Sequence, residues 1–275
     1  MRDGGREGLA AAVDKPSSAR VYDYLLGGRH NYAIDRRFAE QQVAMVPDIR
    51  EAMRSNRAFV GRAVRFALER GVRQFVDIGA GLPSQGQAHE VADRVAPEAR
   101  ARVVYVDNEE IAHAHARILL DDTADPERHK AVFADFFDTD ELWRQVLATG
   151  VIDGTEPVCL LMTAILHFMP PEREPEKALR HYQDQLCPGS VLVLTHGCVE
   201  IDEEKARAVA ANYARTTNPA HLRSRAEFTE FFTGWDLVEP GVTWTVEWRP
   251  DGAEPEWWGG QPARSRYLAG VAVKP

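Results

Sequence analysis

Short apolar runs alternate with helical segments along the middle of this 275-residue chain, from about residue 72 to residue 197. Each run ends on a polar or glycine-rich turn, as a buried strand does where the chain leaves a sheet. Strands separated by helices predict a mostly parallel sheet with helices on both faces, because a parallel neighbour is reached only through a crossover. The chain is therefore expected to have an α/β fold. The five runs are RQFVDIG, ARVVYVD, AVFAD, PVCLLMT and SVLVLTHG.

Three helices are expected before this alternation begins. Ser17 or Ser18 can cap a short helix, ARVYDYLL, which the two glycines at 27 and 28 would end. A second helix is expected over about residues 35–45. A third is expected from Ile49 to Leu68, where apolar residues recur at three- and four-residue spacing. The expected division of the chain is a disordered leader over 1–15, an N-terminal helical extension over 16–70 and one α/β domain over 71–275.

The chain changes character again after residue 217. Ser224 and Glu227 form a capping box that predicts a helix over RAEFTEFF. The later segments WDLVEPGVTWTVEW and RYLAGVAVKP are typical of closing strands and are expected to form an antiparallel hairpin pair at the end of the sheet. Trp257 and Trp258 lie in the longest irregular stretch and are expected to pack back onto the domain.

Composition excludes several classes of function. The net charge of −9 argues against sequence-independent nucleic-acid binding, which depends on cationic side chains that neutralise phosphates. No run approaches the roughly 18 apolar residues that span a bilayer, and the start lacks the apolar centre of a secretory signal. A cytoplasmic location without a membrane partner is therefore expected. Cys159, Cys187 and Cys198 form no C-x-x-C pair and are expected to be free thiols beside apolar runs.

Acids and glycines gather where three successive strands are predicted to end, in VDIGAGLPS, VVYVDNE and FADFFD. Glycines at such a turn let the backbone approach a ligand closely. Ligands of open α/β sheets bind outside the carboxyl ends of the strands, so these tips are expected to form one site. The residues expected to bind a cofactor there are Asp77, Gly79, Ala80, Gly81, Asp107, Asn108, Asp135 and Phe136.

Two cofactor classes fit an acid at the tip of the second strand, where Asp107 can accept both hydroxyls of a ribose. A dinucleotide fingerprint, G-x-G-x-x-G/A, would need a small apolar residue where this chain has Ser84 after Pro83, and Asp77 would repel the pyrophosphate. S-adenosylmethionine (SAM) suits the same acid, because Asp77 can help to hold its cationic amino-acid tail. The pattern favours SAM over NAD. Acids that merely cap helices are the third interpretation.

The chain resembles an actinobacterial family of SAM-dependent methyltransferase-like proteins whose substrate is generally unassigned. The resemblance covers the chain from about Pro16 to the last strand, and its N-terminal block is the most specific part. It implies the class I methyltransferase fold, a Rossmann-like sheet of seven strands with the last antiparallel, preceded by N-terminal helices. Pro83 departs from the third glycine of the general methyltransferase loop. The blocks are PSSARVYDYLLGGRHNYAIDR, FVDIGAGLPS, VVYVDNE, LRSRAEFTEFF and LVEPGV.

The resemblance also implies a role for the segment RVYDYLLGGRHNYAID, because N-terminal helices of class I methyltransferases often fold over the cofactor. As a lid, this segment would turn at its two glycines and use tyrosine faces to exclude water and contact the sulfonium. Arg20 and Asp23 could join in binding the amino-acid end. The alternative is that the tyrosines are the buried face of a docking helix, and both can hold at once. The lid residues expected at the cofactor are Tyr24, Gly28 and Asn31.

After the fourth strand comes MTAILHFMPPE, which in class I enzymes lines the site beside the transferred methyl. Thr163 is expected at the cofactor, and His167 is the candidate general base, with a purely structural histidine as the alternative. His113 and His115 point to different faces of a helix, so no metal site is expected. The arginines of the third helix are expected on a solvated face that could attract an anionic substrate.

The expected function is SAM-dependent methylation of an oxygen, nitrogen or carbon nucleophile on a small-molecule acceptor, by a monomer or homodimer. Methyl transfer is an in-line displacement, so orientation and desolvation can supply most of the rate and a base is optional. The alternatives are a SAM-binding sensor or scaffold without catalysis and, further off, an NAD(P)-binding oxidoreductase.

Overall fold

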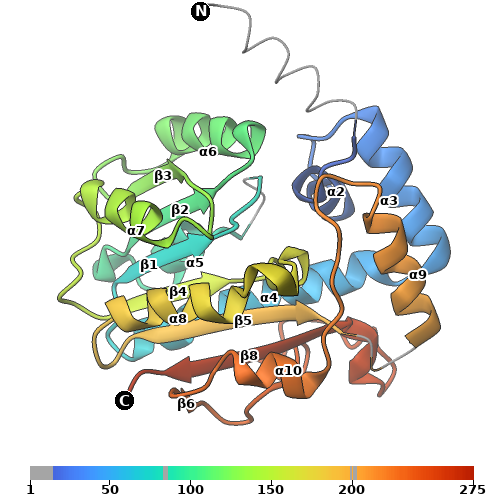
Figure 1. The fold of residues 1–275 in the computed structure, drawn as a ribbon. Helices are drawn as coiled ribbons and strands as arrows, with labels where there is room; N and C mark the ends of the chain where they lie inside the picture. The colour runs from blue at the N-terminus through green and yellow to red at the C-terminus, as the bar shows by residue number, and fades with distance from the viewer. Residues whose placement is uncertain (1–14, 83–85, 199, 201–202) are drawn as a thin grey trace, which may run out of the picture.

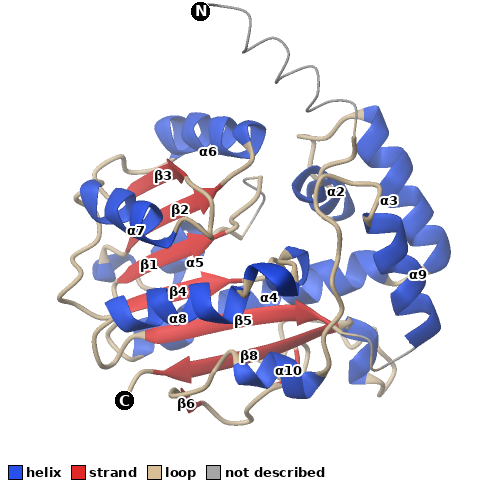
Figure 2. Ribbon diagram, in the orientation of Figure 1, coloured by secondary structure: helices blue, strands red, loops and turns tan. Residues whose placement is uncertain are grey.

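A mixed eight-stranded sheet runs through the molecule, with helices on both faces (Figures 1 and 2). The computed structural model describes residues 15–82, 86–198, 200 and 203–275, so the expected leader, apart from Lys15, and Pro83 and Ser84 lie outside the described residues. The strands are β1 (Gln74–Ile78), β2 (Arg102–Asp107), β3 (His129–Phe133), β4 (Val158–Met162), β5 (Val191–Gly197), β6 (Asp236–Leu237), β7 (Thr243–Trp244) and β8 (Tyr267–Val273).

Helices form between the first five strands, as the alternation predicts, and the three expected N-terminal helices are also present. The structure adds α9, a helix without a clear stripe of apolar residues that was not predicted. The helices are α2 (Ser18–Leu25), α3 (Ala33–Met45), α4 (Ile49–Glu69), α5 (Ala88–Val95), α6 (Glu110–Thr123), α7 (Thr139–Ala148), α8 (Pro175–Gln185), α9 (Glu203–Tyr213) and α10 (Arg225–Glu230).

The strand order is β3-β2-β1-β4-β5-β8-β6, with β7 also paired to β8. Strands β1 to β5 are parallel, and β8 runs antiparallel to β5. The α/β fold with an antiparallel closing strand is confirmed. The order reverses beside β1, whose two neighbours are β2 and β4. Such a reversal opens a crevice at the carboxyl ends of the strands, where the acids were expected to meet.

The closing strands differ from the expected hairpin pair, because β6 and β7 each pair with β8 rather than with one another. Asp236 of β6 lies opposite Val273, whereas Thr243 of β7 lies opposite Ala269. The seven residues of β8 are long enough to hold two short strands one after the other. The preceding helix α10 follows the prediction, since Ser224 and Glu227 cap each other's backbone N–H groups.

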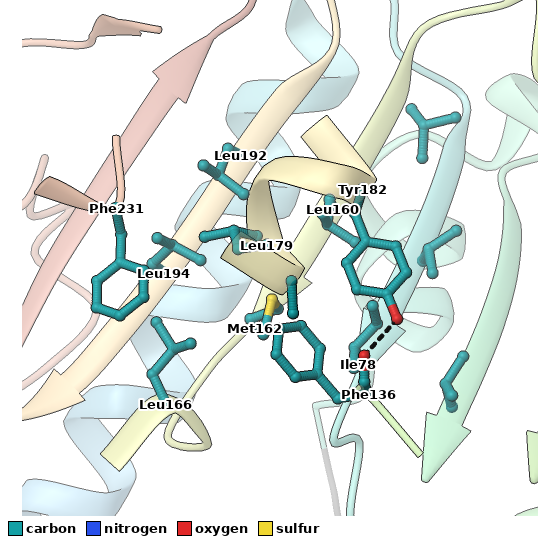
Figure 3. Packing of buried hydrophobic residues seen from close by; sticks show 14 of the residues in the cluster. Ile78, Phe136, Leu160, Met162, Leu166, Leu179, Tyr182, Leu192, Leu194 and Phe231 are labelled. Carbon is teal, nitrogen blue, oxygen red and sulfur yellow. Dashed lines mark hydrogen bonds between the residues drawn. The ribbon is translucent and has the colours of Figure 1, made fainter. Parts of the chain in front are cut away.

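Side chains of the parallel strands alternate between two apolar clusters, one on each face of the sheet. Val76 and Ile78 of β1 pack with α7 and α8, whereas Phe75 packs with α4 and α5. Figure 3 shows the first cluster, in which the Tyr182 hydroxyl of α8 donates a 2.5 Å hydrogen bond to the carbonyl of Phe136. The bond ties the loop after β3 to the core and so fixes one edge of the crevice. In the described part of the chain, no helix is long and apolar enough to cross a bilayer.

The N-terminal helices have an apolar cluster of their own beside the sheet, where α2, α3 and α9 gather (Figure 1). Val21 and Leu25 of α2 are fully buried against Phe38 of α3, and Tyr213 of α9 closes the cluster. Burial on this scale is worth about 1.5–3 kcal/mol for each large apolar side chain. Helix α2 is therefore packed as a core element on one side.

Two arginines of α4 depart from the solvated face expected for them: Arg57 lies at the site described below, and Arg62 is covered by a later segment. Arg62 is buried, and its guanidinium donates hydrogen bonds to the carbonyls of Trp248 and Thr245 and pairs with Glu254. The irregular stretch before β8 folds over α4 and covers this position. Trp257 is held in the same way, by a 3.0 Å bond from its indole N–H to the Ser55 hydroxyl. The expectation that the tryptophan pair packs back onto the domain is confirmed.

Candidate active site

A cavity of about 220 Å³ lies at the carboxyl ends of β1 to β4, at the reversal of strand order. Most of the residues that the strand tips predicted contribute to its wall, because parallel strands bring their carboxyl ends to one edge of the sheet. The predicted residues that line it are Asp77, Gly79, Ala80, Gly81, Asp107, Asn108, Asp135, Phe136, Thr163 and His167.

The turn after β1 holds the carboxylate of Asp107 in place. The N–H of Gly81 donates to Asp107 Oδ2 at 2.8 Å, and the N–H of Glu109 donates to Oδ1 at 2.9 Å. Both glycines of the turn have positive φ, 73° for Gly79 and 64° for Gly81, which a side chain would strain. Each oxygen of Asp107 keeps a further lone pair, so two neighbouring hydroxyls of a ligand can still be bound.

Asp77 is a buried carboxyl in the wall of the cavity. Burial raises the pKa of Asp77 from 3.8 to about 7, the Arg57 guanidinium opposes this shift, and the carboxylate of Asp107 adds to it. The pKa of Asp107 is also raised by burial, against the hydrogen bonds from the backbone. Two desolvated acids side by side favour a cationic ligand, because a positive charge would relieve both the burial and the repulsion.

Asp135 and Phe136 form the far edge of the cavity after β3. The carboxylate of Asp135 accepts a 2.9 Å bond from the N–H of Phe137 and lies 3.5 Å from the Arg173 guanidinium, which stacks 3.7 Å from the centre of the Phe137 ring. The side chain of Phe136 is buried in the core beneath. This edge offers the ring of Phe137, the Asp135 carboxylate as an acceptor and backbone groups, which suit a planar base.

His167 is buried beside the cavity with its ring among other rings, those of Phe168, His196 and Tyr267. Burial holds the pKa of His167 well below 6.5, and the nearby His196 and Arg223 lower it further. The N–H of Gly197 donates to His167 Nδ1 at 3.4 Å, which assigns the ring proton to Nε2. In this state the imidazole is neutral and can donate a hydrogen bond from Nε2.

Three predicted lid residues do not line the cavity. The Tyr24 hydroxyl donates to Glu40, and the Arg50 guanidinium lies over its ring. Asn31 binds the Asp23 carboxylate and the carbonyl of Gly28. A Cβ on Gly28 would lie 2.0 Å from Asp23 Oδ1, so this glycine serves the turn itself.

The N-terminal helices reach the cavity through other residues. Ser18, Ala19 and Tyr22 of α2 and Met53 and Arg57 of α4 line it. The apolar stripe of α4 predicts that Met53 belongs to the core. Met53 is buried, as predicted, but it also lines the cavity. For α2 a signal existed, since residues 18, 19 and 22 share one helix face at three- and four-residue spacing. The remaining wall includes Glu109, Phe137, Arg173, Tyr213, Asn218 and Tyr267.

Arg20 and Asp23, two polar residues of α2, are engaged inside the protein. The Arg20 guanidinium is 1% exposed and binds Asp35 at 2.7 Å and Glu109 at 2.9 Å, while Ser17 donates to Glu109 at 2.6 Å. Glu109 follows the Asp107 tip by two residues. The network therefore joins α2 to the loop that carries Asp107, and Asp23 closes the glycine turn through His30 and Asn31.

Comparison with known proteins gives a family match over nearly the whole chain. The model of the S-adenosyl methyltransferase family matches residues 7–275. A DUF574 family protein from Streptomyces avermitilis is 36% identical, with a TM-score of 0.88 over 95% of this chain and 98% of that one. A candidate methyltransferase from Thermobifida fusca is 32% identical, with a TM-score of 0.85 over 96% of this chain and 97% of that one.

More distant structures share the fold alone. One of them, PigF with S-adenosylhomocysteine (SAH), is 16% identical, with a TM-score of 0.52 over 88% of this chain and 69% of that one. A comparison with curated proteins gives no match.

Proposed function

This chain belongs to the S-adenosyl methyltransferase family, and from that membership we propose that it methylates a small-molecule acceptor in the cavity beside β1 to β4. It is a SAM-dependent methyltransferase with the class I fold, and SAM is its cofactor. The acceptor and the residues that bind each ligand are our proposal. The observation that carries it is the fixed carboxylate of Asp107 between the Gly81 and Glu109 N–H groups, opposite the buried acid Asp77.

The chemistry of the cavity fits SAM part by part. Asp107 would accept the two ribose hydroxyls with its remaining lone pairs. The edge formed by Asp135 and Phe136 would hold the adenine, and the turn from Gly79 to Gly81 would pass under the amino-acid tail, with Asp77 facing its positive charge. When bound, SAM would supply a methyl group on a sulfonium: in-line attack by the acceptor's nucleophile would break the methyl–sulfur bond, release SAH and leave the acceptor's proton to water. The chain's part is to orient both partners and to exclude water.

We propose a positioning role for His167 rather than proton removal. A neutral imidazole that carries its proton on Nε2 can donate a hydrogen bond to an acceptor atom but cannot accept a proton there. The low pKa also makes the ring a weak base. The methyl-transfer rate should then depend on pH in the same way in the wild type and in His167→Gln. A pH-dependent step that is present in the wild type and absent in His167→Gln would restore His167 as the general base.

Asp77 predicts a distinctive dependence of stability on pH. The carboxyl binds its proton more tightly in the folded protein, with a pKa of about 7, than in the unfolded chain, with a pKa of 3.8. Between these values the folded state holds the extra proton, so the contribution of Asp77 to the free energy of unfolding falls as pH rises from about 4 to about 7. Asp77→Asn removes this fall. The melting temperature of the ligand-free variant minus that of the ligand-free wild type should therefore be several degrees higher at pH 8 than at pH 5.

The same substitution separates stability from binding. At pH 8 Asp77→Asn should bind SAM at least tenfold more weakly, because the cationic tail loses its counter-charge. Glu110→Gln, an exposed acid at the start of α6, is the matched control for the loss of one negative charge. A gain in melting temperature that is equal at both pH values would contradict the assignment of the raised pKa to Asp77.

The direct test of the proposed function has two stages. Calorimetric titration of the wild type with SAH and NAD should show tighter binding of SAH. Protein supplied with SAM labelled on the methyl carbon is then mixed with fractionated small molecules of a cell extract, and labelled product is sought by mass spectrometry. Binding of NAD alone would overturn the placement of SAM in this cavity. Binding of SAH with no product from any fraction would favour a sensor or scaffold.

A further inference from the structure

A second, smaller cavity adjoins the proposed cofactor cavity and has a different character. It is a partly open cavity of about 90 Å³ beneath α9 and beside the turn that joins α3 to α4. Met53, His167, Tyr213 and Tyr267 line both cavities and form the partition between them. Behind the partition the wall is mostly apolar. It is made by Val46, Ile49, Ala52, Gly197, Cys198, Ala206, Val209, Ala210, Ala220, Leu222 and Arg266.

Two arginines near this second cavity share one acid. Arg266 is the charged side chain in its wall, and its guanidinium lies 3.4 Å from the Asp48 carboxylate, which also binds Arg264 at 2.9 Å. The Nε atom of Arg266 is buried and has no hydrogen-bond partner among the described residues. Among the described residues of this wall there is no acid for an ammonium ion to meet. The cavity therefore does not suit a cationic occupant, and the rest of its described wall is mostly apolar.

Water is a poor occupant of the same space. A volume of about 90 Å³ equals roughly three waters of the liquid, at about 30 Å³ each, and each would need two to four polar partners. An enclosed apolar cavity of about 150 Å³ accepts a single benzene ring. One aromatic ring, or a branched aliphatic group of that size, matches both the space and the wall.

The partition carries the polar groups that would meet such a ligand. Tyr213 is 8% exposed, and its hydroxyl makes no hydrogen bond with the described residues. Burial raises the pKa of the Tyr213 hydroxyl above its ordinary value, so the group stays neutral. His167 presents an Nε2–H in the same partition. A hydroxyl or amine on a ring could thus be held at the partition while the ring lies behind it.

We propose that this second cavity binds the methyl acceptor, and that the acceptor is a single-ring compound without a positive charge, with its nucleophile at the partition. The inference rests on the proposed function, because it places the reacting atom on the side of the partition that faces the cofactor cavity. It names the class of acceptor that the family comparison leaves open.

Phenol is the probe that tests this assignment. The wild type is saturated with SAH, and phenol binding is measured by ligand-observed NMR and calorimetry. Ala210→Trp fills the cavity and should weaken phenol binding at least tenfold, while SAH affinity stays within twofold. Ala211→Trp, an exposed position on the same helix, is the matched control and should leave phenol binding unchanged.

Val209→Phe is a second, milder filling variant, used if Ala210→Trp lowers the melting temperature or the SAH affinity. Equal phenol binding in the filled variants and in Ala211→Trp would overturn the proposal. A wild type that binds SAH but not phenol would also overturn it. Failure of SAH to bind is a different result: it would overturn the proposed function and the acceptor assignment together.

Discussion

Asp107→Ala is expected to weaken SAH binding by a hundredfold or more. The two ribose hydroxyls would each lose a charge-assisted hydrogen bond worth about 1.5–3 kcal/mol, and a tenfold change corresponds to about 1.4 kcal/mol. The melting temperature of the ligand-free protein should change by only a few degrees. The variant loses bonds from the Gly81 and Glu109 N–H groups, but it also loses a carboxylate whose pKa burial has raised. Calorimetry and thermal unfolding measure both quantities.

Glu110→Gln again serves as the control, because it removes a negative charge three residues away from an exposed position. Its SAH affinity should stay within twofold of the wild type. A loss of less than threefold in Asp107→Ala would remove Asp107 from the ribose site. A collapse of the melting temperature would show instead that the carboxylate is chiefly structural.

Arg20→Met is expected to destabilise the protein by about 3–5 kcal/mol, the usual loss when one partner of a buried ion pair is removed. Asp35 is fully buried and would keep its backbone donors, Ser17 and Tyr32, but lose the counter-charge. At this chain length the fall in melting temperature should be roughly 10 °C. Thermal unfolding monitored by circular dichroism measures it.

Arg50→Met is the matched control on the surface, where the pair with Glu40 is largely solvated and worth about 1 kcal/mol or less. Adding Asp35→Asn to Arg20→Met should recover part of the lost stability, because no buried charge is then left alone. If Arg20→Met were as mild as Arg50→Met, the network would not anchor α2.

Because this network anchors α2, we propose that α2 is a fixed wall of the cavity rather than a lid. Val21 and Leu25 are buried on one side of α2, and Ser18 and Tyr22 line the cavity on the other. Hydrogen exchange should find the amides of α2 protected before any ligand is added. The exposed turn around Gly27 and Arg29 is the part that can still gain protection when SAH binds. Rapid exchange along α2 without ligand would favour a lid.

The sheet and its acids were accessible from sequence because each rests on a local signal. A β-branched run followed by glycine or aspartate marks a strand tip, and parallel strands then bring Asp77, Asp107 and Asp135 together without further information. The N-terminal contribution was harder. Tyr22, Tyr24 and Tyr32 look alike in sequence, and only packing decides that Tyr22 faces the cavity while Tyr24 meets Glu40 and Arg50.

Other features depend on contacts between distant parts of the chain. Arg62 looks like a surface residue until the segment near Trp248 covers it, 186 positions later. The partition between the two cavities joins Met53, His167, Tyr213 and Tyr267 from four separate segments, none of which forms a motif. The position of Tyr213 could not be predicted for a further reason, because α9 carries small residues rather than a strong apolar stripe.

A crystal structure of the wild type with SAH tests the central claim most directly. We predict the two ribose hydroxyls within hydrogen-bond distance of the Asp107 carboxylate, the adenine at the edge formed by Asp135 and Phe136, and the amino-acid tail over the turn from Gly79 to Gly81. Ordered SAH in any other place, or in this cavity with its ribose away from Asp107, would contradict the account.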